Sequence, residues 1–230
     1  TWVQVASLAD HYKFSDDVFA AYGTFSNQFS KWGYQVGVRA ESSVYSGALT
    51  DRDSSFTIAY PISLFPSGFV TYKLNEQDNL QFAYTRRVNR PNFFQTMPFI
   101  DFSDSLNLRQ GNPQLRPEFT NSLELSYQNI FSKGHNILLT AYFKQATNLI
   151  TAYQYTAFNQ DLNREVVITS YTNSDIGYAY GAEFTSKNSL FKWLDLTSNL
   201  NVFQSKVDAS NVENSLSVSR LSWFLKEMVQ

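Results

Sequence analysis

The stretch that decides the fold is Leu80-Gln81-Phe82-Ala83-Tyr84-Thr85, in which large apolar side chains occupy every second position. A period of two places alternate side chains on opposite faces of a β-strand. The pattern returns in Leu123-Glu124-Leu125-Ser126-Tyr127-Gln128 and in Leu194–Val202. Weaker copies occupy three further ranges, Tyr34–Glu41, Ile137–Phe143 and Tyr178–Thr185. The chain is therefore predicted to be all-β.

The patterned segments are longer than ordinary strands, at about 10 to 14 residues against about 5 to 6 in soluble proteins. A tilted strand needs about 9 to 11 residues to cross a membrane. We predict eight strands and the start of a ninth near Ser217. Their ranges are 17–29, 34–46, 62–73, 80–88, 117–131, 137–150, 167–187 and 194–207.

The connections between these strands alternate between short and long. The short ones are 30–33, 75–79, 132–136 and 188–193, and the long ones are 47–61, 89–116, 151–165 and 207–215. Outer-membrane barrels sort their connections in this way, with tight periplasmic turns at one rim and long extracellular loops at the other. We therefore expect an antiparallel up-and-down transmembrane β-barrel in the outer membrane.

Aromatic residues make up 17% of the chain, and charged residues make up the same fraction. The pattern places the aromatics in two belts, as in the interfacial girdles of membrane barrels. The belt at the short turns is Trp32, Tyr34, Phe131, Phe191 and Trp193, and the belt at the long loops is Tyr45, Tyr60, Phe93, Phe94, Tyr153 and Tyr155. The alternative is that these are core aromatics of a soluble β-protein.

Charge and motif content exclude several function classes. With 18 basic and 20 acidic residues the chain lacks the positive field that nucleic-acid binding requires, and with no cysteine it has neither disulfides nor a thiolate metal site. The sequence contains no HExxH, no nucleophile-elbow serine and no glycine-rich phosphate loop. We therefore expect no enzyme, no cofactor and no bound metal.

Four stretches resemble the barrel region of TonB-dependent outer-membrane receptors, especially the Bacteroidetes branch related to the SusC-like transporters. Two of them lie about 20 residues apart, at Tyr84–Phe93 (an RRxxRPxF pattern) and Arg109–Glu118 (GNPxLxPE). Val36–Glu41 is similar to the family's GLRxE strand, and Tyr171-Thr172-Asn173 with Tyr180–Phe184 is similar to a later N…GxE strand.

The resemblance implies a barrel of about 22 strands closed by an N-terminal plug and energised through TonB. Residues 1–230 would form a single partial barrel domain of about eight or nine strands, without the plug and without the C-terminal strand. The chain begins at Thr1 and ends at Gln230, and we expect it to be an internal portion of the barrel. The chain would form the barrel wall of a receptor that imports an oligosaccharide, siderophore, cobalamin or peptide.

Strand parity and loop composition supply candidate site residues. If Leu80, Phe82 and Tyr84 face lipid, then Arg86 emerges outward at the loop rim, near lipopolysaccharide phosphates. Six charged residues have the lumen parity: Arg39, Glu41, Arg87, Glu124, Lys144 and Glu183. Arg87 and Glu124 each lie about eight residues along their strands from a short turn, and this equal distance suggests that they form an ion pair. The longest loop carries a candidate ligand-binding mouth of Phe93, Phe94, Phe99, Asp101, Phe102 and Asp104, for which packing between loops is the alternative.

Two other functions stay open on the sequence. One is a surface adhesin or carbohydrate-binding β-domain, and the other is a passive or secretion-associated barrel without active transport. The expected partners are outer-membrane lipid and lipopolysaccharide, the TonB complex through a plug, and a SusD-like surface lipoprotein.

Overall fold

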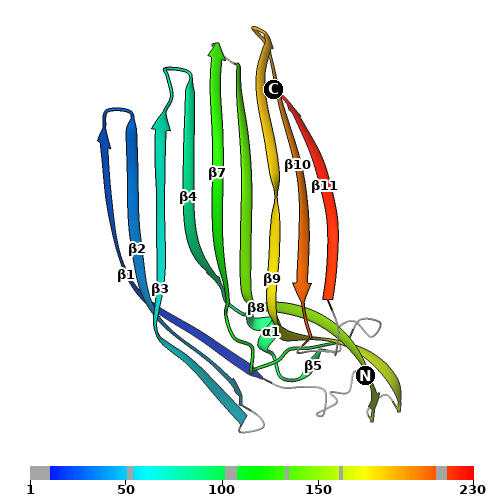
Figure 1. Ribbon diagram of the computed structural model, residues 1–230. Helices are drawn as coiled ribbons and strands as arrows, with labels where there is room; N and C mark the ends of the chain where they lie inside the picture. Colours follow the sequence, from blue (N-terminus) through cyan, green and yellow to red (C-terminus); the bar gives the residue numbers. More distant parts are fainter. Residues whose placement is uncertain (1–10, 51–53, 102–107, 133–134, 161–162, 211–216) are drawn as a thin grey trace.

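The computed structural model describes residues 11–50, 54–101, 108–132, 135–160, 163–210 and 217–230. Its main feature is one curved antiparallel sheet in which each long strand pairs with the next along the chain (Figure 1). The nine long strands are β1 (Tyr12–Phe29), β2 (Trp32–Leu49), β3 (Ser54–Lys73), β4 (Asp78–Asn89), β7 (Glu118–Ser132), β8 (His135–Asn159), β9 (Arg164–Phe191), β10 (Leu194–Asp208) and β11 (Ser217–Val229). The prediction of an all-β antiparallel meander is confirmed.

Two of the four predicted long loops, 47–61 and 151–165, are wrong, because strands continue through most of each. β3 begins at Ser54, β8 ends at Asn159 and β9 begins at Arg164. These extensions contain β-branched and aromatic residues such as Phe56, Ile58 and Tyr155, which favour strands. The connection between β4 and β7 is long, as predicted, and it holds the short elements α1 (Phe93–Thr96), β5 (Ile100–Asp101) and β6 (Leu108–Gln110).

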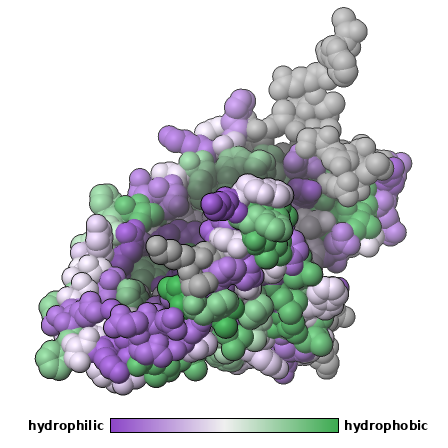
Figure 2. All heavy atoms as spheres, turned by 90° about the horizontal axis from the view of Figure 1, so that it is seen from above, coloured by the Kyte–Doolittle hydropathy of each residue, from purple (hydrophilic) through white to green (hydrophobic). Residues whose placement is uncertain are grey.

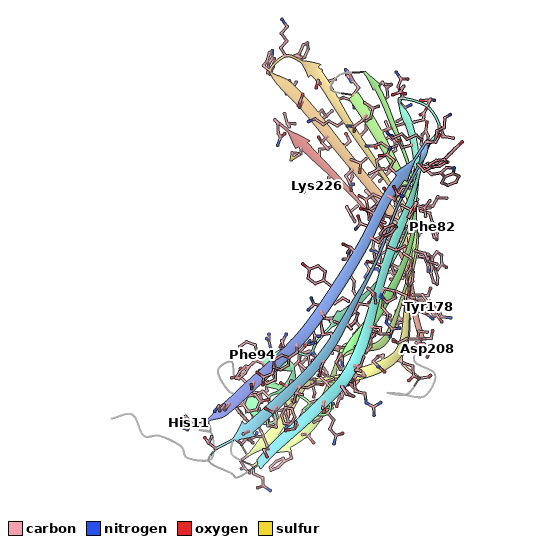
Figure 3. The ribbon with its side chains drawn as sticks, turned by 90° about the vertical axis from the view of Figure 1, so that its left-hand side faces the viewer. His11, Phe82, Phe94, Tyr178, Asp208 and Lys226 are labelled. Atoms are coloured by element: carbon pink, nitrogen blue, oxygen red, sulfur yellow. The ribbon has the colours of Figure 1, made fainter. Side chains whose placement is uncertain are left out.

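The pairing register divides the sheet into an apolar face and a polar face. One row of cross-strand neighbours on the apolar face consists of Tyr34, Val70, Phe82, Leu125, Ala141, Ala182, Val202 and Trp223. Phe82 and Tyr178 lie on one side of the curved sheet and Phe94 on the other (Figure 3). Seen from the short-turn end, hydrophilic and hydrophobic residues gather in separate patches (Figure 2).

Two rows of mostly polar residues bound the apolar face. Near the short turns the row is Asp78, Asn129, Ile137, Ser186, Ser198 and Glu227, and near the loops it is Arg86, Asn121, Gln145, Tyr178, Lys206 and Ser219. Along β4 the rows are eight residues apart, or about 27 Å at about 3.4 Å per residue. Because the strands of a barrel are tilted, a distance of this size along a strand corresponds to a slightly smaller height, close to the apolar band of about 25 Å in outer-membrane barrels. Arg86 lies on this face as expected, with its guanidinium 5.2 Å from the centre of the Phe119 ring.

A β-bulge in β3 exchanges its two faces near the loop end. Glu41 pairs with Ser63 and Ser43 pairs with Tyr60, so Pro61 and Ile62 together oppose the single residue between them. Proline is tolerated at a bulge because no ladder hydrogen bond is lost there. Beyond this point Phe56, Ile58 and Tyr60 share the polar face with Tyr45, although simple alternation with Ile62 and Leu64 places Tyr60 on the other side.

Candidate functional site

The described residues of the connection between β4 and β7, 90–101 and 108–117, run over the polar face at the loop end of the sheet (Figure 1). The connection begins with a capping box around α1, in which Asn92 accepts from the backbone N–H of Gln95 and the Gln95 side chain accepts from the Asn92 N–H, each at 3.0 Å. Such reciprocal caps satisfy two backbone donors that a single helical turn leaves unpaired. We call residues 90–117 the inner segment.

The middle of the inner segment is attached to the β8–β9 hairpin. β6 pairs in parallel with β9, with Leu108 opposite Ile168. Leu108, Val166 and Ile168 are buried together, and partly buried Ile100, Tyr155 and Ala157 pack against them. The hydroxyl of Tyr155 also donates to the Gln110 side chain at 2.7 Å. This apolar cluster fixes the inner segment to strands that lie beyond the membrane band.

Gly111 allows the two halves of the inner segment to touch. A Cβ atom on Gly111 would lie 2.5 Å from the backbone nitrogen of Met97 and 2.7 Å from the carbonyl oxygen of Gln95. Both neighbours are backbone atoms, so they cannot move aside as a flexible side chain does. At this close approach the backbone N–H of Asn112 donates to the Gln95 carbonyl at 2.7 Å. The glycine of the GNPxLxPE pattern is therefore required by packing.

Asparagines hold the end of the inner segment against β9. The side chain of Asn112 donates to the carbonyl of Tyr171 at 3.1 Å. Asn173 accepts from the backbone N–H of Arg116 at 2.8 Å and donates to the Arg116 carbonyl at 2.9 Å. It also donates to the carbonyl of Asn148, a residue with a positive φ of 54°. The backbone at Arg116 is thus fixed from both sides by one side chain.

A buried acid joins two of the motifs recognised in the sequence. Glu41 of β2 has a side chain only 4% exposed, and it pairs with Arg39 at 2.8 Å and with Arg90 at the start of the inner segment. Burying a carboxylate is costly unless it is paired and hydrogen-bonded. The Val36–Glu41 and Tyr84–Phe93 motifs therefore meet at one ionic contact.

Two predicted aromatic belt positions are wrong, because the residues lie on the polar face. Tyr45 is 1% exposed, and its hydroxyl donates to the carbonyl of the fully buried Leu115. Tyr60 is stacked on Tyr45, with ring centres 6.4 Å apart. The Tyr45 ring anchors the inner segment, and neither ring is available to lipid headgroups. In the short-turn belt, by contrast, Trp32 and Trp193 are 51% and 75% exposed.

The six charged residues predicted for the lumen share the polar face in the register. The Arg87–Glu124 ion pair is wrong, because Arg87 lies opposite Thr120 whereas Glu124 lies opposite Ala83. Four residues along a strand amount to about 13 Å. Stagger between strands, which turn counting ignores, causes the error. Glu124 instead accepts from the Ser122 hydroxyl at 3.0 Å.

The candidate ligand-binding residues of the inner segment fall into three groups. The ring of Phe93 packs 5.0 Å from that of Tyr12, and Phe99 lies 6.2 Å from the same tyrosine. Phe94 is 65% exposed, and Asp101 belongs to the β5–β6 pairing opposite Arg109. Phe102 and Asp104 lie outside the described residues. The contacts of Phe93 and Phe99 match the loop-packing alternative, and Phe94 stays a candidate.

Several residues that build this site were missed as individual positions. Gly111, Asn112, Arg116 and Asn173 all lie inside the motifs that carried the family resemblance. The motifs marked them, but only the fold shows that they contact one another. Tyr45 had no signal beyond its place in a belt of aromatics.

Two further properties bear on the chemistry of the site. In the part of the chain that the structure describes, no three His, Asp or Glu side chains lie close enough to hold a metal ion. Within those same ranges, no helix is long and apolar enough to cross a membrane.

The model of the outer membrane protein beta-barrel family matches residues 1–230, so the chain belongs to this family and its place is the outer membrane. A comparison with curated proteins gives no match.

Solved structures show the same fold at low sequence identity. The siderophore receptor PirA from Pseudomonas aeruginosa is 16% identical with a TM-score of 0.59, over 96% of this chain and 50% of the receptor. The copper transporter OprC is 15% identical with a TM-score of 0.59, over 90% of this chain and 32% of the transporter. The alcaligin outer membrane receptor FauA from Bordetella pertussis is 13% identical with a TM-score of 0.59, over 93% and 34%. The chain thus spans from about a third to half of these proteins.

Proposed function

We propose that this chain is part of the wall of a larger, plugged outer-membrane receptor that imports a nutrient. β1 and β11 each pair on one side only. Open sheet edges do not occur in the hydrocarbon of a membrane, because their N–H and C=O groups would be unsatisfied. Further strands must therefore close the barrel. The partial coverage of PirA, OprC and FauA supports the same proposal.

The observation that carries the proposal is the inner segment, which is folded onto the polar face instead of extending into solvent. It is held there by Glu41, Tyr45 and Asn173, which reach it from strands on both sides. An ordered structure inside the mouth of a barrel narrows the opening and presents fixed groups to a ligand. A simple open pore has no need for such contacts.

The mechanism follows from the family resemblance together with this geometry. Groups at the loop end would capture the ligand, and a plug energised through TonB would release it inward. The ligand classes are an oligosaccharide, siderophore, cobalamin or peptide. A SusD-like surface lipoprotein and lipopolysaccharide are the further partners of the proposal, and no catalytic step is part of it.

The test uses the full-length protein in its native outer membrane. Its intact mass after detergent extraction should be several times 26.4 kDa. Cells that carry the protein should accumulate one of the four ligand classes only while TonB is present, and a deletion strain should not. A mass near 26.4 kDa, or TonB-independent uptake accompanied by steady conductance in planar bilayers, would replace the importer with a passive barrel. Binding of cells to surface glycans without uptake would favour an adhesin.

A further inference from the structure

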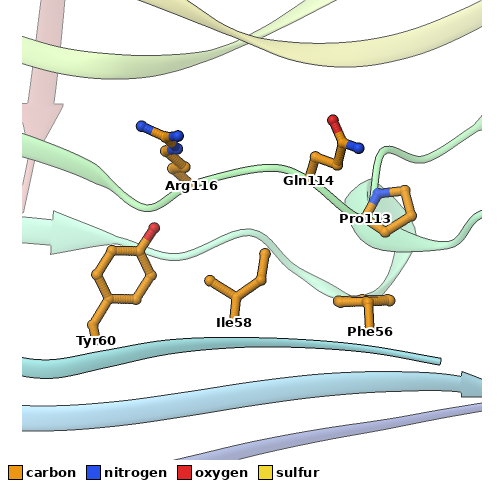
Figure 4. A pocket seen from close by; sticks show the side chains of 6 residues that line it. All are labelled: Phe56, Ile58, Tyr60, Pro113, Gln114 and Arg116. Atoms are coloured by element: carbon orange, nitrogen blue, oxygen red, sulfur yellow. The ribbon is translucent and has the colours of Figure 1, made fainter.

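Beside the inner segment, on the polar face, lies a pocket of about 600 Å³ (Figure 4). One wall is the end of β3 beyond its bulge, with Phe56, Ile58 and Tyr60, and the other is the end of the inner segment. The lining residues of that second wall are Pro113, Gln114 and Arg116. Small-molecule sites typically measure about 300 to 1,000 Å³ and combine apolar walls with a few polar groups. The pocket has this size and this composition.

Both walls are held in place by the contacts described above. The bulge at Pro61 and Ile62 turns the β3 side chains toward the pocket. The Asn173 side chain hydrogen-bonds both the N–H and the carbonyl of Arg116. The carbonyl of buried Leu115 accepts a hydrogen bond from the Tyr45 hydroxyl. The site is therefore largely formed before a ligand arrives, which lowers the entropy cost of binding.

The polar groups of the pocket favour an anion. Among the described residues, the ion pairs join Arg39 and Arg90 to Glu41, and Lys187 to Asp195, so the Arg116 guanidinium has no acid partner there. Figure 4 shows the Tyr60 hydroxyl pointing toward the chain that carries Arg116. Burial raises the pKa of Tyr60. A hydrogen bond with Tyr45 and the charge of Arg116 lower this pKa, but the effect of burial is larger. Tyr60 is thus neutral at physiological pH, and its hydroxyl proton faces Tyr45, whose own hydroxyl donates to Leu115.

One acid faces this region from a neighbouring strand. Asp16 of β1 pairs with Tyr45 of β2, and Tyr45 pairs with Ile58 of the pocket wall. Two strand spacings of about 4.8 Å separate Asp16 from Ile58. The acid therefore lies beside Tyr45 and outside the lining, where it does not replace a ligand anion.

We propose that this pocket binds the acidic, flat apolar portion of the imported ligand. The carboxylate, or another oxyanion, lies against Arg116 with Gln114 as a further donor. The flat apolar group rests on Phe56, Ile58 and Pro113. This inference rests on the proposed import function. It restricts the class of imported ligand to molecules that carry an anionic group next to a flat apolar group. Neutral sugars do not satisfy it.

The test measures equilibrium binding to the full-length protein in detergent, with 2-naphthoate as the probe and neutral 2-naphthamide as its isostere. Wild type should bind 2-naphthoate more tightly than the amide by at least about tenfold, as expected for a charge-assisted hydrogen bond. Arg116→Gln should remove this preference, and Arg116→Lys should restore part of it. Because Asn173 holds the backbone of Arg116 and not its side chain, these variants should fold normally, as shown by the heat-dependent gel mobility of the barrel.

Arg87→Gln is the matched control, since Arg87 lies on the same face outside the pocket. The proposal is overturned if naphthoate and naphthamide bind equally, if Arg116→Gln binds naphthoate as wild type does, or if Arg87→Gln weakens binding as much as Arg116→Gln. The two proposals fail separately. Selective naphthoate binding without TonB-dependent uptake keeps the pocket and removes the importer, whereas uptake that survives Arg116→Gln unchanged keeps the importer and removes the pocket as its ligand site.

Discussion

The two ends of the sheet are stabilised in different ways. At the short turns the contacts stay within one turn or join neighbouring strands: Asn75 accepts from the backbone N–H groups of Gln77 and Asp78 at 2.8 and 2.9 Å, and Asp78 accepts from the Tyr127 hydroxyl of the adjacent β7 at 2.6 Å. At the loop end, contacts such as Arg90 to Glu41 and Asn173 to Arg116 join residues far apart in the chain. A local defect should therefore stay local at the turns, whereas one at the loop end should release the inner segment from several strands together.

Glu41→Gln should have the largest effect, because it leaves the half-buried Arg90 without its acid. Breaking a buried ion pair costs about 3 kcal/mol or more. The free energy of unfolding of the full-length protein refolded in lipid vesicles should fall by about that amount. Glu124→Gln, which alters one hydrogen bond with Ser122, is the control and should cost under about 1 kcal/mol. Equal losses in the two variants would contradict the central role of Glu41.

Gly111→Ala should come next, since its Cβ meets backbone atoms of Gln95 and Met97. Overpacking of this kind costs about 1 to 3 kcal/mol. Residues 90–117 should become sensitive to protease added outside intact cells. Gly23→Ala is the matched control, because no atom lies within 4 Å of the new Cβ. If both variants resist protease as wild type does, the close approach at Gly111 is not required.

Asn173→Ala compared with Asn75→Ala tests the contrast between the two ends most directly, since each side chain bonds backbone groups. Loss of Asn173 should cost about 1 to 2 kcal/mol, because three hydrogen bonds to the backbone groups of Arg116 and Asn148 are lost together. Loss of Asn75 exposes its turn to water, which replaces the bonds. Hydrogen exchange should therefore speed up across the inner segment in the first variant and only around residues 75–79 in the second. A change confined to residue 173 itself would remove the contrast.

The smallest effect should come from Trp193→Ala in the short-turn belt. Trp193 is stacked on Phe191, with ring centres 5.6 Å apart, and is 75% exposed. Losing one such aromatic pair costs about 1 kcal/mol. In a full-length variant that keeps Trp193 as its single tryptophan, lipids brominated near the headgroup should quench its fluorescence more than lipids brominated at the chain ends. The opposite order would place this belt away from the membrane surface.

The sequence by itself determined the strands and their two faces. Alternation at Leu80–Thr85 and its copies depends on each residue and its near neighbours, so nine long strands and their order could be predicted without any long-range contact. The aromatic belt at the short turns could be predicted for the same reason, because Trp32 and Trp193 lie where the alternation stops. Strand ends at the loop side were missed at residues 54–61 of β3 and 151–159 of β8, which were assigned to loops although residues such as Ile58 and Tyr155 favour strands.

Only the tertiary structure decided which way side chains point beyond the bulge and what covers the polar face. One extra residue at Pro61 and Ile62 exchanges the faces on which the alternate side chains of β3 lie, and no local sequence pattern predicts this bulge. The stagger that separates Arg87 from Glu124 likewise belongs to the whole sheet. Glu41 with Arg90, and Asn173 with Arg116, meet because the inner segment crosses the polar face and reaches strands that are not its sheet neighbours. The site is a product of these long-range contacts, whereas the strands are a product of local periodicity.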